Sequence, residues 1–147
     1  MNLIYINTHD SGRYFAPYGY SVDTPAIMAF ARQSTVFRNA FCTAPTCSPS
    51  RAAMLTGQSA HESGMIGLVH RGFTLAQPKR HLAWFLRGQG FETALCGIQH
   101  EAVTAEELGY EQIIVSDREA QWPDNDMLNA DAACEFLMKK HDRPFLL

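Results

Sequence analysis

Short apolar runs alternate with segments of helical periodicity along most of the chain, and this alternation limits the folds that are open to it. A buried strand is expected at residues 2–8, and further strands are expected at residues 36–41, 91–98, 113–116 and 143–147. Between them, apolar residues at helical spacing predict helices over residues 25–34, 81–89 and 126–141, the first with Thr24 as its N-cap. Residues 58–79 are expected to form a long irregular loop. Strands that alternate with helices form a mostly parallel sheet with helices on both faces. The sequence therefore predicts an α/β fold.

The bulk composition excludes several classes of protein. Apolar residues make up 46% of the 147 residues and charged residues 18%, which is typical of a globular rather than a disordered chain. The net charge of −3 provides no basic surface for nucleic acid. No apolar run approaches the roughly 20 residues of a membrane-spanning helix. We therefore expect neither a nucleic-acid partner nor a membrane partner.

Both ends of the chain suggest where it comes from. A strand-like run follows Met1 directly, without the basic and apolar regions of a secretory signal. The chain as given is thus expected to be cytoplasmic, or periplasmic or secreted if its true N-terminus is missing. The other end stops inside the apolar run at residues 143–147, which predicts that the chain is a fragment of a longer protein.

The carboxyl ends of the predicted strands carry polar residues suited to a site. His9 and Asp10 follow the first strand, and His100 follows the strand at residues 91–98. Ligands of parallel sheets bind beyond the carboxyl ends of the strands. These three residues are therefore expected at the ligand-binding edge. The structural alternatives are a turn cap for Asp10 and an ordinary loop residue for His100.

One of the four cysteines stands apart from the others. The cysteines form no CxxC pair and no zinc-type spacing, so Cys42, Cys96 and Cys134 are expected to be small, buried apolar side chains. Cys47 instead precedes a predicted helix that runs from about Ser48 to Gly57. The start of a helix favours negative charge and lowers the pKa of a thiol.

Arg51 lies one helical turn after Cys47, on the same face of that helix. A guanidinium at this position can contact both the side chain at position 47 and an incoming oxyanion. The spacing therefore predicts an anion site that contains a reactive side chain.

The segment Cys47-Ser48-Pro49-Ser50-Arg51, followed by Leu55-Thr56-Gly57, resembles the signature of the sulfatase family. The similarity extends over nearly the whole chain, and residues 47–68 look most like the heparan N-sulfatase branch. The resemblance implies the alkaline-phosphatase-like version of the α/β fold. It also implies that residues 1–147 are the N-terminal part of the catalytic domain, with the C-terminal remainder absent.

The resemblance further implies an activity and its partners. Family members hydrolyse sulfate esters or sulfamates, often of saccharides, through a formylglycine that a separate maturation enzyme makes from the motif cysteine. By this likeness Cys47 is the nucleophile's precursor, Arg51 stabilises charge, and His100 takes the proton whose removal releases sulfate. Asp10, together with His9 and the modified Cys47, is expected to contact a divalent metal. Calcium is the usual ion, with Mg2+, Mn2+ or Zn2+ as alternatives because of His9.

Two positions depart from the family pattern. Members usually have two adjacent aspartates where this chain has His9 and Asp10, and imidazole is a poor ligand for calcium. A lysine usually stands two residues before the catalytic histidine, where this chain has Ile98. One cation of the sulfate pocket is therefore missing unless another residue, such as Arg13, His61 or His70, replaces it.

Other functions stay open at this point. A phosphodiesterase or phosphonate monoester hydrolase of the same superfamily would use a similar pocket, because phosphoryl and sulfuryl groups are both tetrahedral oxyanions. A non-catalytic binding protein that keeps the fold is a third hypothesis, which His9 and Ile98 favour. The sequence also leaves open the sulfated substrate and the oligomeric state.

Overall fold

The computed structural model describes residues 1–116 and 125–147. The chain divides into two compact units, one made of Met1–Tyr5 and Cys42–Leu147 and the other of Ile6–Phe41. Among the described helices, none is both long enough and apolar enough to cross a membrane.

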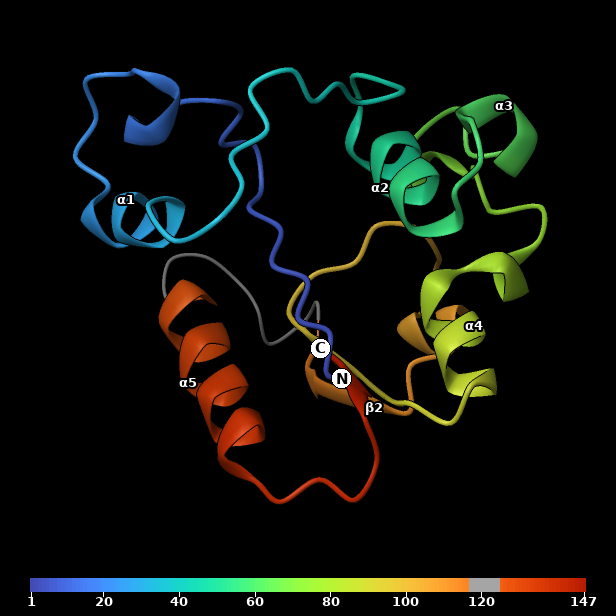
Figure 1. Ribbon diagram of the computed structural model, residues 1–147. Helices are drawn as coiled ribbons and strands as arrows, with labels where there is room; N and C mark the ends of the chain where they lie inside the picture. The colour runs from blue at the N-terminus through green and yellow to red at the C-terminus, as the bar shows by residue number, and fades with distance from the viewer. Residues whose placement is uncertain (117–124) are drawn as a thin grey trace. The chain divides into compact units, whose positions relative to one another are not determined.

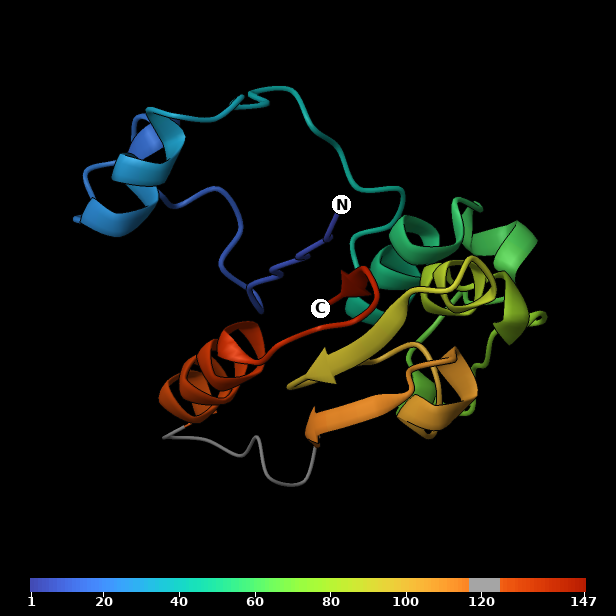
Figure 2. The ribbon, with the colours of Figure 1, turned by 60° about the horizontal axis from the view of Figure 1, so that its bottom comes forward.

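The larger unit is built on a parallel sheet, as the alternation of strands and helices predicted. The strands β1 (Glu92–Cys96), β2 (Gln112–Val115) and β3 (Phe145–Leu146) lie in the order β2-β1-β3. The central strand β1 pairs in parallel with both neighbours (Figure 2). Its register with β2 shifts between Leu95 and Cys96. The predicted α/β fold is therefore confirmed.

Helices cover both faces of this sheet. The helices α4 (Leu82–Gly88) and α5 (Asn125–Met138) both pack on β1 and lie on opposite sides of the strands in Figure 1. Adjacent residues of a strand point to opposite faces, and Thr93 and Ala94 are both buried in β1. On the α5 side, Ala94 clusters with Phe136 and Phe145, whose rings meet edge to face at 5.3 Å.

The N-terminal segment pairs as a strand but is not buried, so the prediction for residues 2–8 was partly wrong. Leu3 forms an isolated parallel bridge with Leu146, and the N–H of Tyr5 donates to the carbonyl of Leu147. Ile4 nevertheless remains 48% exposed. An apolar sequence can pair along one edge, but burial also needs a neighbour on each face, and the described residues cover this segment incompletely.

The smaller unit differs from the sequence prediction in three places. Its elements are the 3-10 helix η1 (Ala16–Tyr18) and the helix α1 (Pro25–Ala31), which ends three residues earlier than expected. Thr24 does not cap α1, because its hydroxyl accepts the N–H of Ala16 at 3.0 Å instead. Residues 36–41 form no strand, and the apolar side chain of Phe41 is 88% exposed.

The segment at residues 58–79, expected as one irregular loop, contains three short helices. They are α3 (Ala60–Ser63) and the 3-10 helices η2 (Val69–Arg71) and η3 (Pro78–Arg80). Ser59 and Glu62 form a reciprocal capping box at the start of α3, in which each side chain binds the other residue's N–H. A further 3-10 helix, η4 (Ala105–Leu108), follows β1.

His81 begins α4 from a fully buried position. Its Nδ1 accepts the N–H of Ala83 at 3.2 Å, so the ring caps the helix as a neutral imidazole. Burial lowers the pKa of His81 from its ordinary value of 6.5 to about 4.

This lowered pKa predicts a loss of stability in acid. The unfolded chain takes up a proton on His81 below about pH 6.5, whereas the folded chain resists doing so down to about pH 4. The contribution of His81 to the free energy of unfolding therefore falls by about 2.5 kcal/mol between about pH 7.5 and pH 4.5. The variant His81→Asn keeps a capping oxygen but has no imidazole to protonate. Its free energy of unfolding, measured in urea, should therefore fall between these pH values by about 2.5 kcal/mol less than that of the wild type. Equal pH dependence in both proteins would contradict the assignment.

Candidate functional site

The helix α2 (Cys47–Thr56) carries Cys47 at its first position. Thr46 precedes it in an extended conformation and accepts the N–H of Ser50 through its carbonyl at 2.9 Å. The N–H groups at the start of a ten-residue helix carry partial positive charge. Cys47 is half-buried there and forms no disulfide, so its side chain is not sealed in the core.

The sequence folds this way because α2 is anchored at its start and ended by a glycine. Ser48 is 1% exposed, and its hydroxyl accepts the N–H of Val69 at 3.3 Å, which ties the start of the helix to η2. Gly57 then ends the helix in a left-handed conformation, with φ of 68°. The variable position of the motif, between the cysteine and the proline, thus has a structural role.

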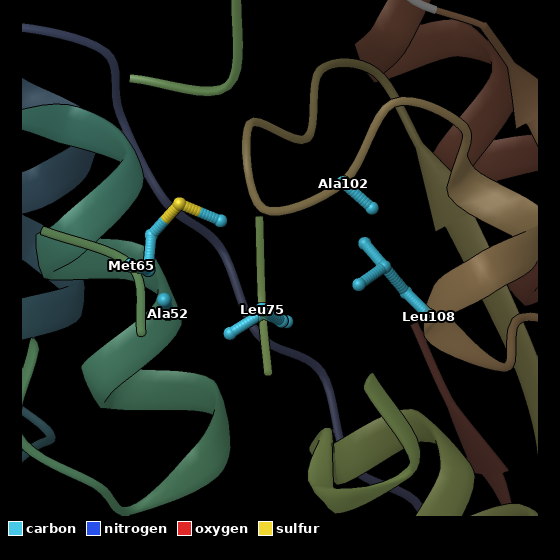
Figure 3. Close-up of a cluster of buried hydrophobic side chains, with 5 residues drawn as sticks. All are labelled: Ala52, Met65, Leu75, Ala102 and Leu108. Carbon is cyan, nitrogen blue, oxygen red and sulfur yellow. The ribbon is translucent and has the colours of Figure 1, made fainter. Parts of the chain in front are cut away.

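A buried apolar cluster holds α2 against the loop that follows β1. Figure 3 shows the cluster, in which Ala52 of α2 and Ala102 of the loop lie on either side of the Leu75 side chain. Its members are Ala52, Met65, Leu75, Ala102 and Leu108. Ala52 immediately follows Arg51, and Ala102 lies two residues after His100. The cluster therefore fixes the two backbone segments that carry these site residues.

Arg51 points toward the carboxyl end of β1. One of its terminal nitrogens donates to the carbonyl of Ile98 at 3.5 Å, a long hydrogen bond across 47 residues of sequence. The turn out of β1 requires Gly97, whose φ is 97° and where an added Cβ would lie 3.1 Å from the Asn129 amide. The structure thus brings the motif arginine to the segment that ends at His100.

The turn around His100 is held by two buried polar side chains that sequence reasoning missed. Gln99 accepts the N–H groups of Glu101 and Ala102 through its amide oxygen and donates to the Ala102 carbonyl at 3.0 Å. Glu101, which is 1% exposed, accepts the N–H of His100 at 2.8 Å. A glutamate in a loop is usually exposed, so only the tertiary structure identifies this one.

Two tyrosine hydroxyls lie in the same electrostatic surroundings. Burial raises the pKa of both Tyr5 and Tyr110. The charge of Glu101 raises the pKa of each further, whereas the guanidinium of Arg51 lowers it. Both phenols therefore stay protonated near neutral pH and can act as hydrogen-bond donors. Tyr5 already donates to the sulfur of Met54 in α2.

The expected metal ligands His9 and Asp10 belong to the smaller unit. His9 Nδ1 lies 3.1 Å from Asp10 Oδ2, and the Asp10 side chain is 84% exposed. Asp10 also has a positive φ of 52°, which aspartate tolerates in tight turns. Across residues 1–116 and 125–147, no three His, Cys, Asp or Glu side chains are grouped closely enough to hold a metal ion. These described donors alone therefore do not amount to a metal site.

The remaining candidates do not form a second site. His61, His70 and Arg13 are exposed. Cys42 and Cys134 are also exposed, which corrects the expectation of buried thiols. Cys96 is half-buried and donates to the Asn129 carbonyl at 3.3 Å.

A pocket of about 290 Å3 lies elsewhere on the larger unit. Its lining includes Glu92 and His141, whose Oε2 and Nδ1 atoms are 2.9 Å apart. Glu92 begins β1, so this pocket is at the amino end of that strand, whereas His100 follows its carboxyl end.

Comparison with known proteins agrees with the motif. Over 103 residues the chain is 39% identical to human N-sulphoglucosamine sulphohydrolase, a match that covers 67% of this chain and 20% of that protein. It is 34% identical over 74 residues to an ulvan-active sulfatase of Formosa agariphila, covering 50% of this chain and 12% of that one. Mouse steryl-sulfatase is 36% identical over 85 residues, which are 52% of this chain and 14% of that protein.

The chain thus spans about a fifth, or less, of the length of these relatives. The family model described as Sulfatase, in contrast, matches residues 1–147, the full extent of the sequence. The chain belongs to the sulfatase family.

Proposed function

We propose that the protein is a sulfatase that hydrolyses sulfate esters or sulfamates through a formylglycine made from Cys47. The observation that carries the proposal is the position of Cys47 at the start of α2, half-buried, with Arg51 one turn later directed at the segment before His100. A helix start and a guanidinium together favour an oxyanion beside the side chain at position 47. Residues 1–147 would form the N-terminal part of the catalytic domain.

Each residue of the site then has a distinct role. Formylglycine supplies, as its hydrate, two hydroxyl groups on one carbon, which serve for attack on sulfur and for release of sulfate. Arg51 holds the sulfuryl oxygens and offsets the charge that builds up on them. His100 handles the proton that accompanies sulfate release, because an imidazole exchanges protons near neutral pH. The hydrogen bond from its N–H to Glu101 fixes the backbone that carries this ring.

The substrate and the partner follow from the same reasoning. Two of the relatives carry names that refer to a sulphoglucosamine and to ulvan, which favours a sulfated saccharide as substrate. The maturation enzyme that makes formylglycine would be a transient partner that reads the segment from Cys47 to Gly57.

A divalent metal, most often calcium in this family, would be held in part by Asp10, and residues other than those described would supply further ligands. The carboxylate of Asp10 is exposed and offers the hard oxygen atoms that calcium prefers. His9 adds a softer nitrogen beside it, which favours Zn2+ or Mn2+ more than the second aspartate of the usual pattern would. When bound, the ion would supply Lewis-acid polarisation of the sulfate group.

Modification of Cys47 can be tested directly by mass spectrometry. In protein isolated from its own cell, the peptide containing Cys47 should be about 18 Da lighter than its sequence predicts, because an aldehyde replaces the thiol. The peptide that carries Cys42, if it is separated by cleavage, should keep its unmodified mass. An intact thiol at position 47 in the native protein would contradict the proposed nucleophile.

Two substitutions should separate the nucleophile from the charge stabiliser. Cys47→Ala should abolish hydrolysis of an aryl sulfate, and Arg51→Ala should lower kcat on the order of a hundredfold or more. Arg87→Ala is a matched control, since Arg87 is exposed, contacts the Trp84 ring, and lies in the helix that leads to the amino end of β1. Comparison with a phosphodiester substrate tests the alternative activity. Faster turnover of the phosphodiester would assign the protein to that class.

The metal proposal predicts a change in binding that needs no turnover. Calorimetric titration should show that Asp10→Asn weakens binding of calcium. His9→Asp should strengthen calcium relative to zinc, because it exchanges an imidazole for a carboxylate. If both variants bind each ion as the wild type does, these residues are not ligands.

A further inference from the structure

Glu101 is the one carboxylate that is buried in the described residues, and it lies within the candidate site. Its side chain is 1% exposed, in a turn that Gln99 also braces from a buried position. Burial of a carboxylate is costly unless hydrogen bonds and charges compensate for it. One compensating bond is the N–H of His100 at 2.8 Å. A buried charge directly beside a proposed catalytic histidine calls for a functional explanation.

Arg51 is an opposite charge that shares the surroundings of Glu101. The two side chains act in opposite directions on the hydroxyls of Tyr5 and Tyr110, so all four groups belong to one electrostatic cluster. Arg51 reaches this cluster at the Ile98 carbonyl, three residues before Glu101. The position where the family pattern has a lysine is thus occupied by the uncharged Ile98, three residues before a buried carboxylate.

We propose that Glu101 sets the charge selectivity of the site, so that the pocket accepts a singly charged sulfuryl group and disfavours a doubly charged phosphoryl group. This inference rests on the proposed function and names the feature that would select its substrate class. The juxtaposition that carries it is a buried carboxylate, hydrogen-bonded to the backbone of His100, in the same cluster as the anion-binding arginine.

The physical reason is the difference of one charge between otherwise similar groups. A sulfate ester or sulfamate carries one negative charge near neutral pH, whereas a phosphate monoester carries nearly two, because its second pKa is about 6. A fixed negative charge therefore repels the phosphate monoester about twice as strongly as it repels the sulfate ester. In a poorly solvated site, one additional unit charge at several ångströms changes affinity on the order of tenfold. The uncharged Ile98 acts in the same direction, because it omits a cation.

The proposal can be tested by calorimetric binding of methyl sulfate and methyl phosphate at about pH 8, where the second is a dianion. The full protein in its native form is compared with Glu101→Gln, which removes the charge but keeps an oxygen that can accept the His100 N–H. Ile98→Lys, at a half-buried position, adds a positive charge and leaves Glu101 intact. If Glu101→Gln does not fold, Ile98→Lys is the variant that tests whether charge at this turn sets the selectivity. Glu106→Gln, an exposed position in η4, is the matched control.

The expected result is a shift in the ratio of the two Kd values. Glu101→Gln and Ile98→Lys should each shift that ratio toward methyl phosphate on the order of tenfold, and Glu106→Gln should leave it unchanged. If the folded variants bind both anions with the wild-type ratio, the charge inference is overturned while the proposed function stands. If the wild type binds neither anion, the anion site itself is contradicted, and the proposed function with it.

Discussion

The packing of α2 against the loop after β1 is the constraint on which the described site depends. Arg51 and His100 are 49 positions apart in sequence, and neither could hold an anion in a defined geometry without a rigid connection. Ala52 and Ala102 supply that connection through their shared apolar cluster (Figure 3). The two alanines lie on either side of Leu75 in Figure 3, and close packing around that side chain tolerates little displacement. The reactive end of the helix is therefore positioned by its apolar inner face.

The polar side of the same packing determines the charge of the site. The chain lacks a lysine at Ile98 and has a buried carboxylate at Glu101, so the two differences act in the same direction on the electrostatic potential. A site of this kind attracts anions less strongly overall but discriminates more sharply between singly and doubly charged ones. Selectivity is a difference between two affinities, so loss of general attraction can be its cost. Under this proposal, the absence of the lysine and the presence of the buried carboxylate both favour singly charged anions.

Much of the candidate site could be predicted from the sequence because its signals are local. The segment from Cys47 to Gly57 specifies a helix with its own start and end, and the structure has that helix. Local signals failed where a competing partner was available. Thr24 had the sequence context of a helix cap, but its hydroxyl binds Ala16. Residues 36–41 had the composition of a strand without a pairing partner among the described residues.

The role proposed for Glu101 could not have been predicted, because it depends on burial by segments distant in sequence. The support for this turn begins in α4, where the buried ring of His81 lies 5.6 Å from the ring of Tyr110, edge to face. Tyr110 in turn shares its electrostatic surroundings with Glu101 and Arg51. The links from His81 to Tyr110 and from Tyr110 to Glu101 join segments that are far apart in sequence. None of them can be read from the residues next to position 101, where a glutamate in a loop would ordinarily be exposed.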